Sequence, residues 1–491
     1  GVLHFMYKST CVKNHIVKNY IYNSVYQIFA VIAPLLTMPY VSRVLGATGI
    51  GIFGYTESIA KYFILFGTLG SNLYGQREIA YVQDNIKKRT IVFKEIISFR
   101  FLTVFIAGII YLAIFCSTGE YKQVFLILAL EVFASAFDIS WFFQGIQEFK
   151  KVVMRNIIIK SLSIFFVFLF VQSNQDVSIY ALCYVLPVLI SNLSLWAYLP
   201  KYLTHVKCNK CVTLKHMIPL LTLFIPQIAT EVYTVLDKTM LGIFASDINQ
   251  VGYYEQSSKI IKVLVYFITA LGIVMLPQMS KLFVEGKTAE IQKNIKQSFQ
   301  FVFFLGFPLM FGIIGVAGNF VPWFYGEGYT PVILLMSSIS PIIVIIGISN
   351  VIGKQYLLPT RHQQTYTISV ILGAIVNFIL NLLLIPTYNA LGASIATVAA
   401  ELSVTIIQIW FVRKEIPIFP YLKKATSYLC VSIFMFIAIF GVGIVTSSGI
   451  IGIIIQSCIG MLIYFSTLAL MKDDMIKKGL NIINGWLLMH R

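Results

Sequence analysis

The sequence predicts an all-α integral membrane protein with fourteen transmembrane helices, and three observations carry this prediction. First, 58% of the 491 residues are hydrophobic and 12% are charged, whereas soluble domains are about 25% charged. Second, apolar windows of about 20 residues, the length that crosses a bilayer, recur along the chain. Third, the basic residues are concentrated in alternate loops. The composition excludes a soluble enzyme, a disordered chain and a disulfide-rich secreted module.

The apolar windows define the helices in chain order, because each window ends at a glycine, a proline or a charged residue. They cover residues 19–41, 50–72, 96–116, 121–142, 152–171, 177–199, 217–245, 252–277, 299–318, 330–353, 364–384, 391–412, 425–446 and 449–470. The segment before Tyr20 is basic and polar, and the first window is long enough to span. We therefore expect no cleavable signal peptide.

The distribution of Lys and Arg predicts the orientation. If the N-terminus lies inside, the successive inside segments carry three, five, three, four, four, two, four and four basic residues, which is 29 of the 37. The outside segments carry Arg43 and, at the edge of a window, Lys122, and the remaining six basic residues lie further inside the windows. Cytoplasmic loops are enriched in Lys and Arg, and a missed span would move every later loop to the other side. We expect both termini in the cytoplasm, and the net charge of +17 then predicts no nucleic-acid partner.

The loops predict that the protein is not an enzyme. The longest outside loop, 319–330, has twelve residues, and no inside loop has room for an ATPase domain. The sequence contains no GxxxxGK[ST] phosphate loop and no HExxH zinc motif. The six histidines fall in predicted cytoplasmic segments, where they cannot act as bases within the membrane. We expect no catalytic residues and no cofactor.

One inside loop contains residue types that bind metals. The string HVKCNKCVTLKH combines Cys208 and Cys211 with His205 and His216. A basic cytoplasmic loop with chance cysteines is the favoured interpretation, so we predict no metal site. The other five cysteines are scattered through spans and cytoplasmic segments, which predicts no disulfide.

Charged residues inside the windows are the candidates for function, since a charge at mid-bilayer costs about 2.5–3.5 kcal/mol on insertion scales. Apart from Lys122 and Arg155 near window ends, the thirteen residues are Glu57, Lys61, Arg100, Glu131, Asp138, Lys160, Glu231, Asp237, Lys238, Glu255, Lys259, Lys262 and Glu401. Several share one helix face at i, i+4 and i+7 spacing. Two uncharged polar pairs, Asn23 with Gln27 and Asn377 with Asn381, have the same i,i+4 spacing. Interhelical ion pairs that only fix packing are the alternative for any single residue. The whole set favours a hydrated central cavity.

A weak internal repeat predicts the domain organisation. GIGIFGYTESIAKYF at 49–63 resembles VGYYEQSSKIIKVL at 251–264, and this offset of 201 aligns Lys61 with Lys262. Parallel repeats with a site near the bilayer midplane are a transporter architecture. We expect an N-lobe over 1–205, a cytoplasmic linker over 206–216, a C-lobe over 217–415, two further spans over 416–470 and a cytoplasmic amphipathic tail over 471–491.

Four longer strings resemble recurring stretches of one transporter family. They are PLLTMPYVSRVLGATGIGIFGY (34–55), WFFQGIQEFKKVVMRN (141–156), KQYLLPTRHQQTYTISV (354–370) and NFILNLLLIPTYNALGASIATVAAE (377–401). They resemble the polysaccharide transporter branch of the multidrug/oligosaccharidyl-lipid/polysaccharide (MOP) exporter superfamily, and within it the Wzx-type flippases for O-antigen or capsule repeat units. The likeness extends from about Asn14 to the end of the twelfth window.

This resemblance implies a function. The substrate would be a short oligosaccharide on undecaprenyl pyrophosphate, moved from the inner to the outer leaflet of a bacterial cytoplasmic membrane by two rocking six-helix lobes without ATP. Multidrug exporters of the same superfamily usually have twelve spans. Lipid II flippases usually carry arginines in span 1, where this chain has none before Arg43. Both stay open as alternatives, and a membrane-bound glycan polymerase or transferase is the alternative from another class.

The charged and polar residues can now be assigned expected roles. We expect Lys61, Lys262 and Lys259 to contact the pyrophosphate or acidic sugars, because ammonium groups are mobile point charges. Further substrate-binding candidates are Arg100, Lys160, Asn23 and Gln27. The candidates for charge balance or for coupling to H⁺ or Na⁺ are Glu57, Glu231, Asp237, Glu255, Asp138 and Glu401. The expected partners are membrane lipids, a polysaccharide polymerase and glycosyltransferases.

Overall fold

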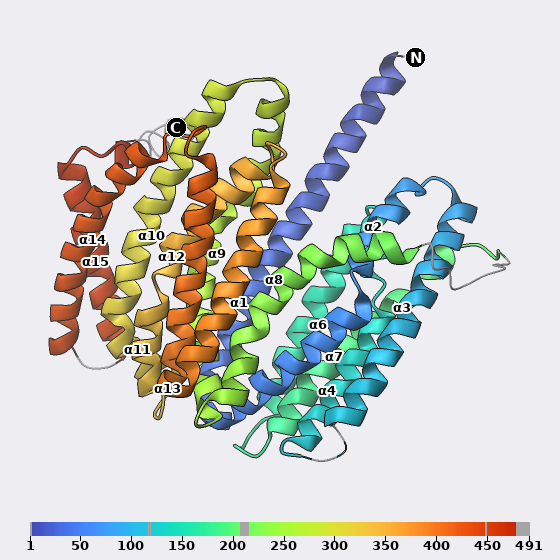
Figure 1. The fold of residues 1–491 in the computed structure, drawn as a ribbon, viewed down its shortest axis with the longest axis horizontal. Coiled ribbons are helices and arrows are strands. Elements are labelled where there is room, and N and C mark those ends of the chain that lie inside the picture. The colour runs from blue at the N-terminus through green and yellow to red at the C-terminus, as the bar shows by residue number, and fades with distance from the viewer. Residues whose placement is uncertain (1, 116, 118, 207–215, 447–448, 478–491) are drawn as a thin grey trace, which may run out of the picture. The chain divides into compact units, whose positions relative to one another are not determined.

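A computed structural model describes residues 2–115, 117, 119–206, 216–446 and 449–477, without the side chains of 2–28, 31, 149, 273, 274 and seven positions between 222 and 232. The regular structure in these ranges is helical (Figure 1). The α-helices are α1 (Val2–Thr68), α2 (Ser71–Tyr81), α3 (Ile86–Phe115), α4 (Lys122–Ala134), α5 (Ser140–Gly145), α6 (Phe149–Phe170), α7 (Val177–Trp196), α8 (Met217–Phe244), α9 (Asn249–Val284), α10 (Thr288–Tyr325), α11 (Thr330–Ile339), α12 (Ile342–Ile352), α13 (Gln363–Val412), α14 (Ile418–Val445) and α15 (Ile450–Leu470). Short 3₁₀ segments, η1 (Ser135–Phe137) and η2 (Leu199–Lys201), and a π-helix, η4 (Gly353–Leu357), connect them.

Eleven stretches of the described residues are long and apolar enough to cross a membrane, so the chain is an all-α, multi-pass membrane protein. The two longest of these stretches, Ile32–Tyr81 and Gln363–Val412, have 50 residues each. A non-helical residue interrupts the helix in both, Gly46 (φ 67°) in α1 and Asn389 (φ 50°) in α13. The sequence predicts fourteen spans because it divides each of these two stretches into two spans and counts α8 as a further span. The number of spans stays a prediction.

The two interruptions use residue types that tolerate a positive φ. Gly46 has no Cβ, and asparagine is one of the few other residues that adopt this region. The side chain of Asn389 also caps a neighbouring segment, because its Oδ1 accepts a hydrogen bond from the backbone N–H of Ser246 at 2.8 Å. Local sequence therefore explains why two apparently continuous apolar helices change direction.

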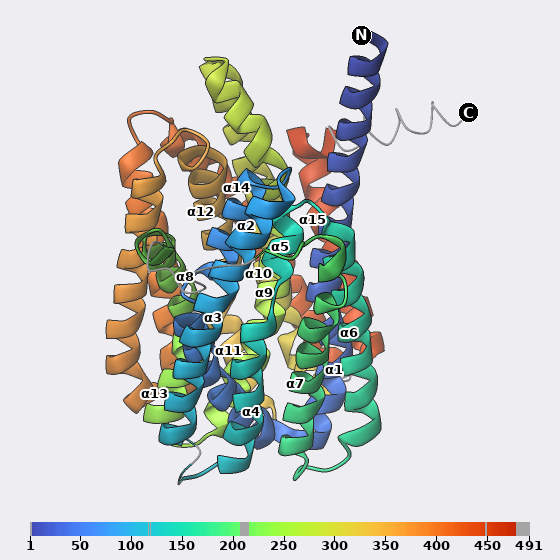
Figure 2. The same cartoon turned by 90° about the vertical axis from the view of Figure 1, so that its right-hand side faces the viewer.

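The chain divides into two compact units, Gly1–Thr239 and Met240–Arg491. In the first unit, α4, α7 and α6 lie side by side (Figure 2). An aromatic core closes one end of this unit, where Phe93 of α3 stacks on Trp141 of α5 at 5.6 Å. Gly75 of α2 packs directly on this indole, since a Cβ there would lie 2.4 Å from Trp141 Cε3.

In the second unit, α10 packs against α14 and α15 through buried polar side chains. Asn319 donates to Gln456 Oε1 at 3.0 Å, and Gln456 Nε2 donates to the carbonyl oxygens of Gly315 and Ile439 at 3.2 and 3.0 Å. Buried amides that are hydrogen-bonded in this way fix the register of neighbouring membrane helices. The last two helices are therefore an integral part of this unit.

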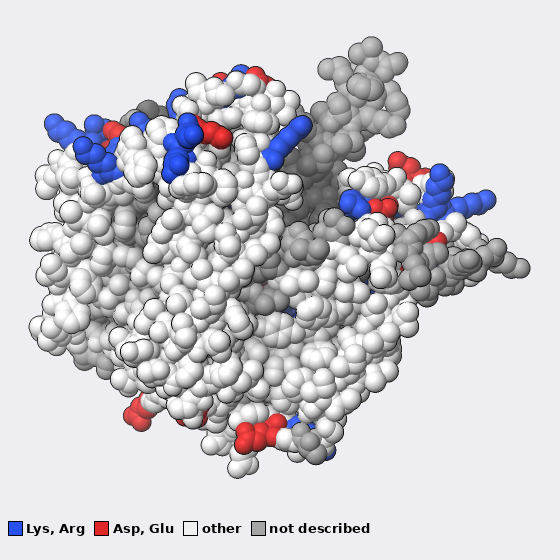
Figure 3. Space-filling view, viewed as in Figure 1, with Lys and Arg blue, Asp and Glu red and all other residues white. Residues whose placement is uncertain are grey.

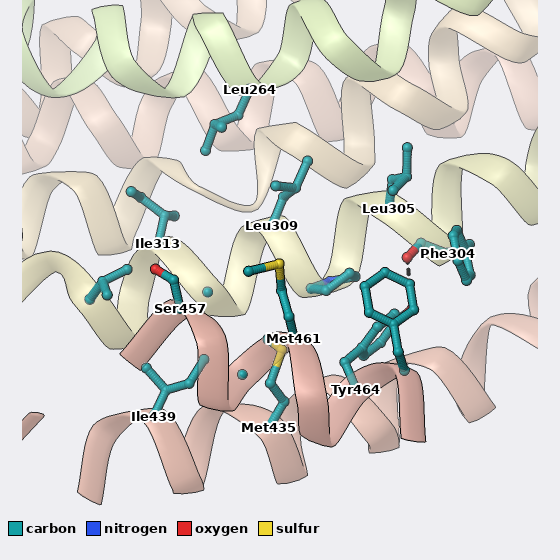
Figure 4. Close-up of a pocket in the computed structure, with 15 residues that line it drawn as sticks. Leu264, Phe304, Leu305, Leu309, Ile313, Met435, Ile439, Ser457, Met461 and Tyr464 are labelled. Atoms are coloured by element: carbon teal, nitrogen blue, oxygen red, sulfur yellow. Dashed lines mark hydrogen bonds between the residues drawn. The ribbon is translucent and has the colours of Figure 1, made fainter. Parts of the chain in front are cut away.

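An apolar cavity of about 390 Å³ lies between α9, α10, α14 and α15 (Figure 4). Leu264, Leu309, Met435 and Met461 point into it, and the Tyr464 hydroxyl is directed to the Phe304 carbonyl oxygen at 2.7 Å. The lining is almost entirely hydrocarbon. This chemistry does not suit a sugar or an ion, so the polar site must be sought elsewhere.

The second unit carries its loop charges asymmetrically (Figure 3). In the second unit, hydrogen bonds of Glu415 with Gln292 and Tyr356 bring together the loop ends that carry Lys and Arg. The opposite end, where Ser246 meets Asn389, carries the acidic residue Asp247. Figure 3 shows the basic side chains of this unit gathered at one end, with an uncharged surface along its length. Within this unit, the structure therefore places the residues of the predicted inside loops at one end, and the orientation itself stays a prediction.

Candidate functional site

A charged cluster lies in the first unit around Glu57, in a stretch that is long and apolar enough to cross a membrane. This residue and Lys61 are one helical turn apart on α1, beyond the interruption at Gly46. Lys61 Nζ lies 2.6 Å from Glu57 Oε1, and Lys238 Nζ of α8 lies 3.3 Å from Glu57 Oε2. One carboxylate is thus shared by two lysines from two helices.

Further polar groups complete this cluster, which we call the Glu57 site. Tyr184 of α7 interacts electrostatically with Glu57, and Glu131 of α4 interacts electrostatically with both Glu57 and Lys61. Glu131 is buried, and its Oε2 has no hydrogen-bond partner among the described atoms. Four helices, α1, α4, α7 and α8, therefore converge on one polar point in an apolar bundle.

A hydroxyl pair next to the Glu57 site fixes α8 against α1. Ser58 Oγ and Thr239 Oγ1 lie 2.7 Å apart, and Thr239 also contacts the hydroxyl of Tyr62 at 3.4 Å. Ser58 directly follows Glu57 in the sequence, and Thr239 directly follows Lys238. The ion pair and the hydroxyl pair thus define one rigid contact between the two helices.

The three members of the shared ion pair differ in exposure. The side chain of Lys61 is 38% exposed, whereas those of Lys238 and Glu57 are 10% and 7% exposed. An anionic ligand can reach Lys61 but has little access to the other two. The arrangement can present one ammonium group to a ligand and keep its counter-ion buried.

The second unit carries a related site. Glu255 and Lys259 of α9 form an i,i+4 pair at 2.9 Å, with side chains 11% and 36% exposed. Lys262 lies about one turn further along α9 and is exposed. An offset of 198 residues aligns the pair Glu57–Lys61 of α1 with the pair Glu255–Lys259 of α9. The predicted sequence repeat uses an offset of 201 and aligns Lys61 with Lys262 instead. We call Glu255, Lys259 and Lys262 the Glu255 site.

Other predicted polar residues of the second unit lie on α13. Asn377 and Asn381 are fully buried, and Asn381 Nδ2 donates to Asn377 Oδ1 at 3.1 Å. Glu401 is partly buried, and its carbonyl oxygen accepts a hydrogen bond from Thr405. The predicted uncharged pair on this helix is therefore a direct hydrogen bond.

Arg100 of α3 lies at a helix junction. Its guanidinium donates to the Ser135 carbonyl oxygen at 2.9 and 2.7 Å, to Ser71 Oγ at 2.9 Å and to Asn72 Oδ1 at 2.6 Å. Asp138 lies 3.9 Å away and accepts the N–H of Ser140, the first residue of α5, at 3.0 Å. Because the guanidinium is fully buried and bonded on several sides, its geometry favours a packing role over substrate contact.

The remaining predicted residues are placed as follows. Lys160 is partly buried on α6, Glu231 is exposed on α8, and Asp237 is buried beside Lys238. The backbones of Asn23 and Gln27 belong to α1, and their side chains fall outside the described residues. Lys238 was part of the charged set but was not assigned a role from the sequence. Its i, i+4 spacing from Thr234 on α8 was the available signal.

His216, at the start of α8, has two buried partners in the first unit. Its Nδ1 lies 2.7 Å from the Tyr74 hydroxyl, and its Nε2 lies 3.0 Å from Glu95 Oε2. Cys208 and Cys211 of the same loop fall outside the described residues. Within the described part of the chain, no group of three or more His, Cys, Asp or Glu side chains is arranged to hold a metal ion.

Comparison with solved structures identifies the class of fold. The chain is similar to a structure titled "Lipid II flippase MurJ, inward closed conformation", with a TM-score of 0.74 and 17% identity over 92% of this chain and 99% of that one. It is also similar to an inward-facing multidrug resistance MATE family transporter of the MOP superfamily, with a TM-score of 0.56 and 13% identity over 80% of this chain and 99% of that one. The fold is therefore that of MOP-superfamily transporters.

Sequence comparison then identifies the family. Residues 16–283, more than half of the chain, match the family described as "Polysaccharide biosynthesis protein". The chain belongs to this family, which confirms the predicted membership in the polysaccharide transporter branch with its Wzx-like flippases. A relative named "Putative O-antigen transporter" from Escherichia coli (strain K12) is 25% identical over 403 residues, which are 81% of this chain and 97% of that protein.

Proposed function

We propose that this protein is a flippase that moves oligosaccharide repeat units, carried on undecaprenyl pyrophosphate, from the inner to the outer leaflet of a bacterial cytoplasmic membrane. The units would serve the synthesis of O-antigen, capsule or exopolysaccharide. Family membership supports this function, as does a relative named for O-antigen transport. The observation that carries the proposal is the Glu57 site, a charged cluster at membrane depth with one lysine within reach of an anionic ligand.

The lysines are the proposed contacts for the substrate headgroup. Lys61 contacts the pyrophosphate or acidic sugars, together with Lys262 and Lys259 of the Glu255 site. Arg100, Lys160, Asn23 and Gln27 are secondary candidates, and the geometry of Arg100 makes it the weakest of them. The polyprenyl tail stays in the lipid, because extracting it costs about 0.8 kcal/mol per CH₂ group.

The acidic residues are the proposed elements of charge balance and coupling. Glu57 and Glu255 hold the lysines in place while no substrate is bound. Together with Glu231, Asp237, Asp138 and Glu401, they are candidates for H⁺ or Na⁺ binding during the cycle. Transport that continues unchanged after both the proton and the sodium gradients are collapsed would contradict the coupling.

The proposed architecture has fourteen spans with both termini in the cytoplasm, arranged as two six-span lobes and two further spans. The transport mode is alternating access. Glycosyltransferases on the inner side would supply the substrate, and a polymerase on the outer side would consume it. The protein itself forms and breaks no covalent bond.

The test is the location of the lipid-linked oligosaccharide in a strain that lacks this gene. The proposal expects complete repeat units to accumulate on the cytoplasmic leaflet and to disappear when the gene is restored. Unpolymerised units on the outer surface would favour a polymerase or transferase instead. Accumulation of lipid II would favour a lipid II flippase, and restored drug resistance in a sensitised host would favour a multidrug exporter.

A further inference from the structure

We propose that Lys238 is a positioning residue that keeps Glu57 paired while Lys61 leaves it to bind the anionic headgroup. This inference rests on the proposed function and adds a residue of α8 to the substrate site. Glu57 would pair with two lysines, of which Lys61 moves to the ligand and Lys238 stays paired. The argument depends on geometry, exposure and the cost of an unpaired buried charge.

The geometry gives each lysine its own carboxylate oxygen. Lys61 is 2.6 Å from Oε1 and Lys238 is 3.3 Å from Oε2, so neither lysine has to displace the other. Lys61 is the more exposed of the two, at 38% against 10%. A ligand can therefore reach Lys61, whereas Lys238 is enclosed next to the Ser58–Thr239 contact that fixes its helix.

Electrostatics explains why a second cation is needed. Removing one partner from a buried ion pair leaves an uncompensated charge, which is strongly destabilising. If Glu57 had Lys61 as its one cation, the carboxylate would compete with the ligand for that lysine. With Lys238 at the second oxygen, Lys61 can leave and Glu57 remains part of an ion pair.

The neighbouring groups increase this need. Glu131 lies on α4 within electrostatic range of Glu57 and Lys61, and one of its oxygens has no hydrogen-bond partner among the described atoms. The departure of Lys61 therefore leaves two nearby carboxylates. Lys238 is the buried cation that stays paired with Glu57, and Tyr184 of α7 also interacts electrostatically with Glu57.

The test combines a lysine variant with a suppressor. Lys238→Met should lower transport by about tenfold at equal protein level, because Glu57 then retains Lys61. Replacing the carboxylate in the same chain, as Lys238→Met with Glu57→Gln, should restore most of this loss by releasing Lys61. Removing both partners of a buried ion pair also relieves a purely structural defect, so transport is compared at equal amounts of folded protein in the membrane. Lys238→Arg keeps the charge and should transport normally, and Lys122→Met at the exposed start of α4 is the matched control.

A binding measurement covers the case in which Lys238→Met fails to accumulate. Purified Lys238→Gln and its double variant with Glu57→Gln are titrated with undecaprenyl pyrophosphate and read by native mass spectrometry. We expect about tenfold weaker binding in the single variant and recovery in the double variant. Equal binding by wild type and Lys238→Gln, or a double variant as weak as the single one, overturns the inference.

The two proposals fail in different ways. If Lys61→Met transports normally, the headgroup contact of the proposed function is wrong. If Lys61→Met loses transport while Lys238→Met behaves as wild type, the proposed function stands and the role of Lys238 is wrong. The pair of variants therefore separates the substrate contact from its supporting residue.

Discussion

The Glu57 site and the Glu255 site share one local pattern and differ in what they connect. Both place a glutamate one helical turn before a lysine, on α1 and on α9. In the first unit, the carboxylate also binds Lys238 on α8, which is 181 positions away in the sequence. In the second unit, the pair of Glu255 with Lys259 lies within a single helix.

This difference separates two physical roles for the same pattern. An i,i+4 pair within a helix contributes only about 0.2–0.5 kcal/mol and leaves its lysine mobile. A buried pair between helices has a much larger effect when one partner is removed. We infer that the Glu57 site controls both helix contact and ligand access, whereas the Glu255–Lys259 pair supplies a partly exposed positive charge.

The largest expected effect comes from removing the exposed lysines of both sites. Lys61→Met combined with Lys262→Met should reduce surface polysaccharide to the level of the deletion strain, because the headgroup loses its cationic contacts. Of the single variants, Lys61→Met should have the larger effect. Surface polysaccharide normalised to membrane protein measures this, and an equal effect of Lys262→Met alone would break the comparison between the sites.

The next effect concerns the two glutamates. Glu57→Gln leaves the enclosed Lys238 without this carboxylate and should lower stability by about 3–5 kcal/mol. Glu255→Gln should cost less than about 1 kcal/mol, because Lys259 is 36% exposed and can turn toward polar surroundings. The thermal midpoints of the two purified variants measure the difference. Equal midpoints would show that the two sites are energetically alike.

A smaller effect is expected at the hydroxyl contact beside Lys238. Thr239→Val removes the 2.7 Å hydrogen bond to Ser58 and should cost about 1 kcal/mol. Thr426→Val on an exposed turn of α14 is the control and should leave the thermal midpoint unchanged. If Thr239→Val has no effect either, the contact between α8 and α1 is held by the ion pair alone.

The smallest expected effect is that of Lys259→Met on stability. The pair with Glu255 is partly exposed and within one helix turn, so its loss should change stability by about 0.5 kcal/mol or less. The same variant should still weaken transport, because Lys259 is a proposed headgroup contact. A large fall in thermal midpoint would mean that Lys259 connects helices, as Lys238 does.

Much of the fold was predictable because membrane helices are specified locally. Apolar length and loop charge identified the membrane class, and the predicted breaks between windows near residues 42–49 and 385–390 coincide with Gly46 and Asn389. The i,i+4 pairs Glu57–Lys61 and Glu255–Lys259 were also readable, because helical periodicity places such residues on one face.

The rest depends on which helices are neighbours, and periodicity contains no such information. The sequence listed Lys238 among the charges but could not show that it shares Glu57 with Lys61. It also could not show whether Arg100 binds a substrate or, as in the structure, donates hydrogen bonds to Ser135, Ser71 and Asn72. The sequence therefore predicted which helix faces carry charged residues better than it predicted the role of each of those residues.

The most direct test of the central claim is the leaflet distribution of the lipid-linked oligosaccharide in cells that carry Lys61→Met as the sole copy of this gene. With glycosyltransferases and polymerase intact and the variant present at the wild-type level, we predict that complete units accumulate on the cytoplasmic leaflet, as they do in the deletion strain. A distribution equal to that of wild type, with units reaching the outer leaflet and entering polymer, would contradict the account.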